Sequence, residues 1–319
     1  MKRRSFMTTV AGAAAASCQL SSFRSLLGEG MDMLDVHSYT EMRRYAQLKN
    51  CRVAYVQQGG GPTALFLHGF PLNGFQWCGV IPSLAPHRCC IAPDFMSLGY
   101  TETAETQEIT PETQGEMLAE FLDVLKIKAV DIVANDSGGE VAQIFVAHYP
   151  TRVRTLLLSN CDVDTNSPPA SFAPLLAAAK KALLADGFSR LLADRASARS
   201  ERGLGPFYAN PEDLTDEAID YYFSPLVSSP LRKKQLNDFA ASFENNPLVA
   251  IEPELRKCPA PARILWGTAD TTFDVKWADW LDNTLPHSRG VRRLKGAKLF
   301  FPEEMPDVVA EEAMKLWSV

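Results

Sequence analysis

The stretch Ala129-Val-Asp-Ile-Val-Ala-Asn-Asp-Ser-Gly-Gly-Glu140 joins a short apolar run to a polar turn that contains two glycines. Val and Ile dominate the run, which predicts a buried β-strand over 129–134. A helical pattern follows from Glu140 and ends before Pro150. A strand, a tight turn of small residues and a helix are the unit from which parallel α/β sheets are built.

Similar apolar runs recur on both sides of this stretch and predict further strands. They lie at 52–57, 63–67, 89–92, 153–159, 262–266 and 291–294. The glycines at 59–61 suggest a hairpin before the buried strand 63–67, and a helical pattern with proline at its start covers 111–125. Strands that alternate with helices predict a mostly parallel sheet covered on both faces.

A helical insertion interrupts this alternation between about 162 and 256, where Ala, Leu and charged residues recur at helical spacing. Placed late in an α/β sheet, such a block would lie over the edge where the strands end and ligands bind. We therefore predict four segments. They are an export signal and linker (1–30), a first part of the core (39–162), the helical insertion (163–255) and a second part of the core (256–319).

Composition excludes several classes of protein. A chain of 319 residues that is 46% hydrophobic and 22% charged is globular, with a buried core. A net charge of -6 with both signs interspersed provides no basic surface, so we expect no nucleic acid as a partner. The 7 cysteines follow no metal-binding spacing, and we expect no metal site and no cofactor.

The N-terminus differs from the rest of the chain. Arg3 and Arg4 precede an uncharged, alanine-rich run, which resembles a twin-arginine export signal and is too short to span a bilayer. We therefore expect export to the periplasm or another extracytoplasmic location, with no transmembrane span; an ordinary basic N-terminus is the alternative. Small residues before Cys18 also resemble a lipoprotein cleavage site, which leaves a lipid anchor at Cys18 open.

Three predicted loops with polar residues follow strands directly. They are His-Gly-Phe-Pro at 68–71, Asn-Asp-Ser-Gly-Gly at 135–139 and Gly-Thr-Ala-Asp at 267–270. The carboxyl ends of parallel strands lie at one edge of the sheet, so these loops should meet. With the helical insertion they resemble the α/β-hydrolase fold superfamily, and within it the epoxide hydrolase and haloalkane dehalogenase branch. The resemblance spans about 39–319 and implies an α/β-hydrolase fold: a mostly parallel, eight-stranded sheet with a helical cap.

The nucleophile of this family lies on a strained turn, which requires small residues two positions before it and two and three positions after it. With Asp136 as nucleophile, all three positions hold Ala or Gly. With Ser137 as the alternative nucleophile, two of them hold Asn135 and Glu140, which fit poorly. We favour Asp136, whose carboxylate would attack carbon and form an alkyl ester, whereas a serine would perform acyl transfer. A simple helix cap at Asp136 is the further alternative.

The resemblance implies roles for the other two loops. The backbone N–H of Phe70 would lie beside that of Ser137 and form an oxyanion hole, with His68 as an anchor of its loop. Asp270 matches the acid of the family, which orients a histidine and stabilises its charged form. Capping of the next helix is the alternative for Asp270.

The histidine of the family is missing. In the segment after the last strand, Leu299 or Lys298 occupies its place. His287 precedes the strand 291–294 and would lie roughly 20 Å away, at the opposite edge of the sheet. Loss of a general base typically costs on the order of 10² to 10⁴ in rate, so the pattern predicts impaired turnover unless another group acts as base.

Two functions from different classes fit this pattern. The first is a cofactor-free hydrolase that acts on a small apolar organic substrate (an epoxide, an alkyl halide or an ester) through the Asp136 carboxylate. The second is a catalytically impaired member that binds a small apolar ligand beneath its cap.

The resemblance also bears on the leaving group. Dehalogenases of the family stabilise the halide with an aromatic N–H beside the nucleophile, and Ser137 stands there instead, which argues against halide release. Epoxide opening needs an acid, which the family draws from cap tyrosines. Tyr208, Tyr221 and Tyr222 lie in the insertion and are the candidates, with ordinary core packing as the alternative.

Overall fold

A computed structural model describes residues 33–318 of the chain. The predicted export signal at Arg3 and Arg4 and the predicted lipid anchor at Cys18 lie outside the described residues and stay predictions. Within 33–318, no helix is both long enough and apolar enough to cross a membrane.

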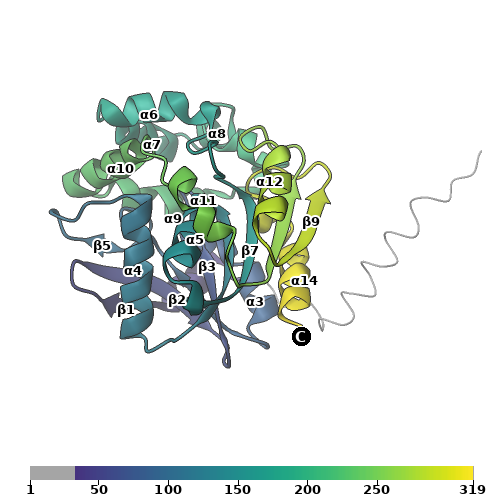
Figure 1. Cartoon of the computed structure of the whole chain (residues 1–319). Helices are drawn as coiled ribbons and strands as arrows, with labels where there is room; N and C mark the ends of the chain where they lie inside the picture. Colours follow the sequence, from purple (N-terminus) through teal and green to yellow (C-terminus); the bar gives the residue numbers. More distant parts are fainter. Residues whose placement is uncertain (1–32, 319) are drawn as a thin grey trace, which may run out of the picture.

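A single large sheet lies at the centre of the described chain (Figure 1). Its strands are β1 (Arg43–Gln47), β2 (Cys51–Gln58), β3 (Thr63–Leu67), β4 (Cys89–Pro93), β5 (Glu102–Thr103), β6 (Val130–Asp136), β7 (Val153–Cys161), β8 (Ala262–Gly267) and β9 (Ser288–Leu294). Eight of them follow the order β1-β2-β4-β3-β6-β7-β8-β9, and the two-residue β5 pairs with β2. β2 is antiparallel to β1 and β4, whereas all pairings from β4 to β9 are parallel. The predicted mostly parallel, eight-stranded sheet is confirmed, with β5 as an addition.

Burial explains why the central strands read as continuous apolar runs. Every residue of β6 is buried, because β6 lies between β3 and β7 and helices cover the sheet. A strand covered on both faces has no solvent side on which polar residues would alternate. The edge strand β1 differs: Ala46 is its only buried residue, and its other residues are exposed or half-buried.

Helices cover the sheet. Those outside the insertion are α2 (Val36–Glu41), α3 (Val80–Leu84), α4 (Pro111–Val124), α5 (Ser137–His148), α12 (Lys276–Thr284), α13 (Phe301–Glu304) and α14 (Pro306–Trp317). In Figure 1, α4 and α5 stand side by side in front of the sheet, and these two helices pack against each other. α3 packs against α14, which lies on β7 and β8.

The residues between β7 and β8 form helices. These are the short 3₁₀ segments at Ala170–Phe172, Gly205–Phe207 and Pro211–Asp213, with α6 (Ala173–Lys180), α7 (Leu184–Ala193), α8 (Arg195–Arg199), α9 (Asp216–Val227), α10 (Pro230–Ser242) and α11 (Leu248–Leu255). In Figure 1, α6, α7, α8 and α10 gather above the upper end of the sheet, and α11 lies lower, against α5.

Two boundaries differ from the sequence prediction. The hairpin predicted around 52–57 is formed by β2 with β1. The strand β1 was not predicted, because it contains no apolar run. The helix predicted from Glu140 begins three residues earlier, at Ser137, because the backbone turns into the helix directly after Asp136. That early start places the nucleophile candidate at the junction of strand and helix.

Candidate active site

The turn between β6 and α5 is strained at Asp136. This residue has φ 55° and ψ -133°, a backbone conformation that residues other than glycine rarely adopt. The two glycines behind it leave no room for side chains: a Cβ on Gly138 would lie 2.4 Å from the Leu67 carbonyl oxygen, and one on Gly139 would lie 2.4 Å from the Cys161 Cβ. Close packing therefore explains the small residues two and three positions after Asp136. Ser137 is the first residue of α5 instead.

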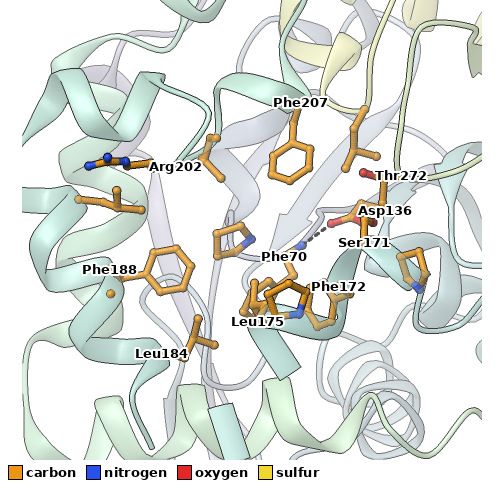
Figure 2. Close-up of a pocket in the computed structure, with 18 of the residues that line it drawn as sticks. Phe70, Asp136, Ser171, Phe172, Leu175, Leu184, Phe188, Arg202, Phe207 and Thr272 are labelled. Atoms are coloured by element: carbon orange, nitrogen blue, oxygen red, sulfur yellow. Dashed lines mark hydrogen bonds between the residues drawn. The ribbon is translucent and has the colours of Figure 1, made fainter. Parts of the chain in front are cut away.

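The loop after β3 lies against the Asp136 carboxyl. The backbone N–H of Phe70 donates to Asp136 Oδ2 over 2.8 Å, the bond drawn in Figure 2. The backbone N–H of Ser137 also hydrogen-bonds this carboxyl. A Cβ on Gly69 would lie 2.5 Å from Asp136 Oδ2, so only glycine permits this approach. The predicted pair of donors, Phe70 and Ser137, is thus brought to the carboxyl oxygen where an oxyanion would form.

His68 holds this loop in place. Its Nε2 accepts a hydrogen bond from the backbone N–H of Phe95 over 3.0 Å, and its Nδ1 contacts the Gly69 carbonyl oxygen at 2.9 Å. Complete burial lowers the pKa of His68 to about 4, so the ring is neutral. The predicted anchoring role of His68 is confirmed, and its ring nitrogens have no capacity left for acid–base work.

Asp270 is occupied by its own loop. Its Oδ2 accepts from Asn160 Nδ2 over 2.7 Å, and its Oδ1 accepts from the backbone N–H of Thr272 over 2.8 Å. Asn160 in turn bonds both backbone groups of Gly267 at the end of β8. Asp270 therefore braces the turn after β8 and does not line the cavity described below. It does not cap the next helix as the alternative expected, because α12 begins at Lys276 and its N-cap is Val275.

Leu299 lines the cavity beside Asp136, at the place where the family carries histidine. Its side chain is buried, and its carbonyl oxygen accepts from Asn135 Nδ2 over 3.1 Å, which ties this loop to the nucleophile turn. His287 stands before β9, which runs parallel to β8, and so lies at the opposite edge from Asp270. Among residues 33–318, none of the histidines lines the cavity.

A cavity of about 740 Å³ extends from Asp136 towards the helical insertion. Its walls are largely apolar, with phenylalanine, proline and leucine, and charged residues of the insertion also line it. Phe70, Phe172, Phe188, Phe207, Phe243 and Phe300 contribute to them. In Figure 2, Asp136 lies at one side of this space and Arg202 at the far side. Such a lining favours an apolar molecule that fits between the core and the insertion.

The three cap tyrosines lie elsewhere. Tyr221 OH accepts from Arg43 Nη2 over 2.6 Å, and Tyr222 OH donates to Glu303 Oε1 over 3.0 Å. Tyr208 is completely buried against Phe300, and its hydroxyl has no hydrogen-bond partner among the described residues. None of the three lines the cavity. The structure therefore does not bring a cap tyrosine to Asp136 as an acid, because all three are held in the packing of the insertion on the core.

Sequence analysis missed Asp162, which lines the cavity together with Asp136 and Ser137. It directly follows β7, the strand beside β6, so its place after a strand at the same edge could have indicated it. Burial raises the pKa of the Asp162 carboxyl. Burial, followed by the negative charge of Asp162, raises the pKa of Asp136.

Glu140 is a third buried carboxyl close to this site. The Ser167 hydroxyl donates to Glu140 Oε1 over 2.9 Å, and it also lowers the pKa of the Asp162 carboxyl, against the larger effect of burial. Within the described chain, Glu140 Oε2 has no hydrogen-bond partner. Burial therefore raises the pKa of three carboxyls in this region, those of Asp136, Asp162 and Glu140.

Glu140 makes stability depend on pH. Burial raises its pKa from 4.5 to about 8, so folding favours the protonated form. Stability from such a group is fully present below the unfolded pKa and is lost as pH rises through the folded pKa. Glu140→Gln does not titrate and retains a side chain that can bond Ser167. We expect it to match the wild type near pH 4 and to be more stable at pH 9, by on the order of a few kcal/mol.

Urea unfolding at both pH values measures this difference. Glu116→Gln, at an exposed position of α4, is the matched control and should show no such dependence. A stability difference of equal size at both pH values would contradict the expected titration of Glu140.

Comparison with known proteins agrees with this arrangement. The family described as alpha/beta hydrolase fold matches residues 62–304. Epoxide hydrolase 1 of Caenorhabditis elegans is 26% identical over 300 residues, covering 85% of this chain and 69% of that protein. Haloalkane dehalogenase 2 of Mycobacterium tuberculosis is 26% identical over 289 residues, covering 86% of this chain and 95% of that protein.

Solved structures agree in fold. The epoxide hydrolase CorEH superposes with a TM-score of 0.71 at 20% identity, covering 86% of this chain and 98% of that one. An alpha/beta hydrolase fold protein from Burkholderia ambifaria superposes with a TM-score of 0.73 at 18% identity, covering 89% and 99%. The family match, the strained carboxylate turn and the loop that donates to it have one explanation: this chain belongs to the alpha/beta hydrolase fold family, in which it is similar to epoxide hydrolases and haloalkane dehalogenases.

Proposed function

We propose that the Asp136 carboxylate attacks an electrophilic carbon of a small apolar substrate and forms an alkyl ester. The observation that carries the proposal is the strained turn, in which Phe70 N–H holds Asp136 Oδ2 while the residue faces an apolar cavity. Strain of this kind persists only where the surrounding structure imposes it, and it gathers at functional sites.

The attack requires no base. Asp136 Oδ1 forms a bond to carbon, and the bond from that carbon to a halogen or a ring oxygen breaks, so that the leaving group departs with the bonding electrons. The N–H groups of Phe70 and Ser137 fix Oδ2 and would later stabilise the oxyanion when water attacks the ester. Relatives named for epoxides and haloalkanes support an electrophile of this kind.

Hydrolysis of the ester is the impaired step. Water must be activated near Asp136, where Leu299 supplies no base. We therefore propose slow turnover with an ester that accumulates. The occupied Asp270 and the aliphatic Leu299 favour a second candidate, reversible binding of a small apolar ligand in the same cavity.

Intact-protein mass spectrometry distinguishes these functions. After incubation with 1,2-epoxyhexane or 1-bromohexane, we expect one covalent adduct on the peptide that holds Asp136. Asp136→Asn should form none, because an amide oxygen is a poor nucleophile.

Ser137→Ala is the matched control beside it and should still form the adduct. An adduct on Ser137 from an activated ester would instead support the serine as nucleophile. Reversible binding without any adduct would overturn the proposal in favour of a binding protein.

A further inference from the structure

We infer that Asp162 is the acid of this site: it protonates the ring oxygen when Asp136 opens an epoxide or a similar strained cyclic ether. This inference rests on the proposed function and deepens it. It assigns a catalytic role to a carboxyl that neither the sequence pattern nor the missing histidine indicated.

The backbone sets Asp162 beside the nucleophile. β6 and β7 pair in parallel with Asp136 opposite Cys161, and Asp162 is the next residue. Adjacent strands lie about 4.8 Å apart. The N-terminus of α5 is pressed against the same place, since a Cβ on Gly139 would touch the Cys161 Cβ. Asp136 and Asp162 therefore reach the same end of the cavity from neighbouring strands, and both line it.

An unsatisfied hydroxyl at this end points to a polar atom of the ligand. The Ser137 side chain is 4% exposed and lines the cavity, and its Oγ has no hydrogen-bond partner among residues 33–318. A buried hydroxyl without a partner costs free energy, which a polar ligand atom would recover. Phenylalanine, proline and leucine form most of the walls beyond, and charged side chains of the insertion also line the cavity, so the expected ligand carries a polar group near Ser137 on a largely apolar body.

Two neighbouring buried carboxyls are expected to share one proton, because the charge of one disfavours ionisation of the other. Burial, followed by the charge of Asp162, raises the pKa of Asp136, and the backbone N–H groups of Phe70 and Ser137 lower it. Burial, followed by the charge of Glu140, raises the pKa of Asp162, and the Ser167 hydroxyl lowers it. The state that reacts has Asp136 ionised and the proton on Asp162.

Glu140 and Ser167 position this acid. The Ser167 hydroxyl donates to Glu140 Oε1 over 2.9 Å. Glu140 does not line the cavity and would touch no substrate. Its role is to hold the Ser167 hydroxyl and, through its charge, to raise the pKa of Asp162.

The step balances with these residues alone. Asp136 Oδ1 bonds to a ring carbon while the bond from that carbon to the ring oxygen breaks, and the oxygen takes the Asp162 proton to become a hydroxyl. The product is a hydroxyalkyl ester of Asp136 beside an ionised Asp162.

The Asp162 proton should matter for one leaving group and not for another. An alkoxide is a strong base and needs the proton as it departs, whereas a bromide ion leaves without one. Removal of the Asp162 proton should therefore slow epoxide opening and leave bromide displacement alone. A purely structural role of Asp162 would affect both reactions alike.

The experiment follows the rate at which Asp136 is modified by 1,2-epoxyhexane and by 1-bromohexane, which place the same chain in the cavity. In Asp162→Asn we expect the epoxide rate to fall by about 10² to 10⁴-fold. The bromide rate should stay unchanged, because the asparagine amide and the protonated Asp162 carboxyl are both neutral beside the ionised Asp136. Asp164→Asn is the matched control, since Asp164 lies two residues further and does not line the cavity.

The bromide reaction also reports that Asp162→Asn is folded. An equal loss with both reagents, or no loss with the epoxide, would overturn the role of Asp162 and leave the Asp136 proposal standing. If the wild type forms no adduct with either reagent, the proposed function fails and the role of Asp162 fails with it.

Discussion

The Leu299→His variant is expected to release the ester that the wild type accumulates, about 10² to 10⁴-fold faster. Leu299 already lines the cavity beside Asp136, so an imidazole there would stand where water must be activated. Asp270 has the capacity to orient it: a carboxylate accepts about four hydrogen bonds, and Asn160 and the backbone N–H groups of Thr272 and Phe273 supply three.

The experiment measures how fast the ester on Asp136 disappears. The adduct is formed with a limiting amount of 1,2-epoxyhexane, excess reagent is removed, and the mass of the ester is followed with time. Lys298→His provides the matched control, because Lys298 is the neighbouring residue and does not line the cavity. Decay no faster than in the wild type, or decay that persists when Asp270→Asn is added, would contradict the expected pairing of imidazole and carboxylate.

The fold followed from local pattern because the central strands are buried on both faces. β3, β6 and β8 are short and apolar, and each ends at a polar loop, so the apolar runs and the loops that end them both indicated the strands. β1 could not be predicted in the same way. It is an edge strand with Arg43 and Arg44 at its start, and its place depends on pairing with β2 rather than on an apolar face.

The sequence predicted those site residues whose backbone conformation requires particular neighbouring residues. Asp136 was found through the small residues that its turn requires, and Phe70 through the loop after a strand. Asp162 was missed because a lone carboxyl after a strand has no motif; only the pairing of β6 with β7 brings it to the nucleophile. The sequence left open whether Tyr221 and Tyr222 face the cavity or pack in the core, because a tyrosine in an amphipathic helix does not reveal which way its hydroxyl points.

Asp136→Gly is expected to be more stable than Asp136→Ala, although both variants lose the adduct. Both remove the buried carboxyl, and only glycine also removes the Cβ that is strained at φ 55°. Strain of this kind is on the order of 1–3 kcal/mol. Inside a helix or strand, a protein with glycine is ordinarily about 0.5–1 kcal/mol less stable than one with alanine. We therefore expect a net gain of about 1 kcal/mol in the free energy of unfolding for glycine over alanine.

The same pair of substitutions at Glu116 gives the opposite sign. Glu116 lies inside α4 on its exposed side, so alanine should be the more stable residue there by about 1 kcal/mol. Urea unfolding of the four variants measures both differences under one condition. If alanine is the more stable residue at Asp136 as well, the turn stores no strain, and the conformation that carries the proposed nucleophile is not imposed by the fold. If glycine is the more stable residue at Asp136 and alanine at Glu116, the chain keeps a destabilising residue where a carboxylate meets the Phe70 N–H and the cavity. Such a loss of stability at a reactive position is the trade that a working nucleophile requires.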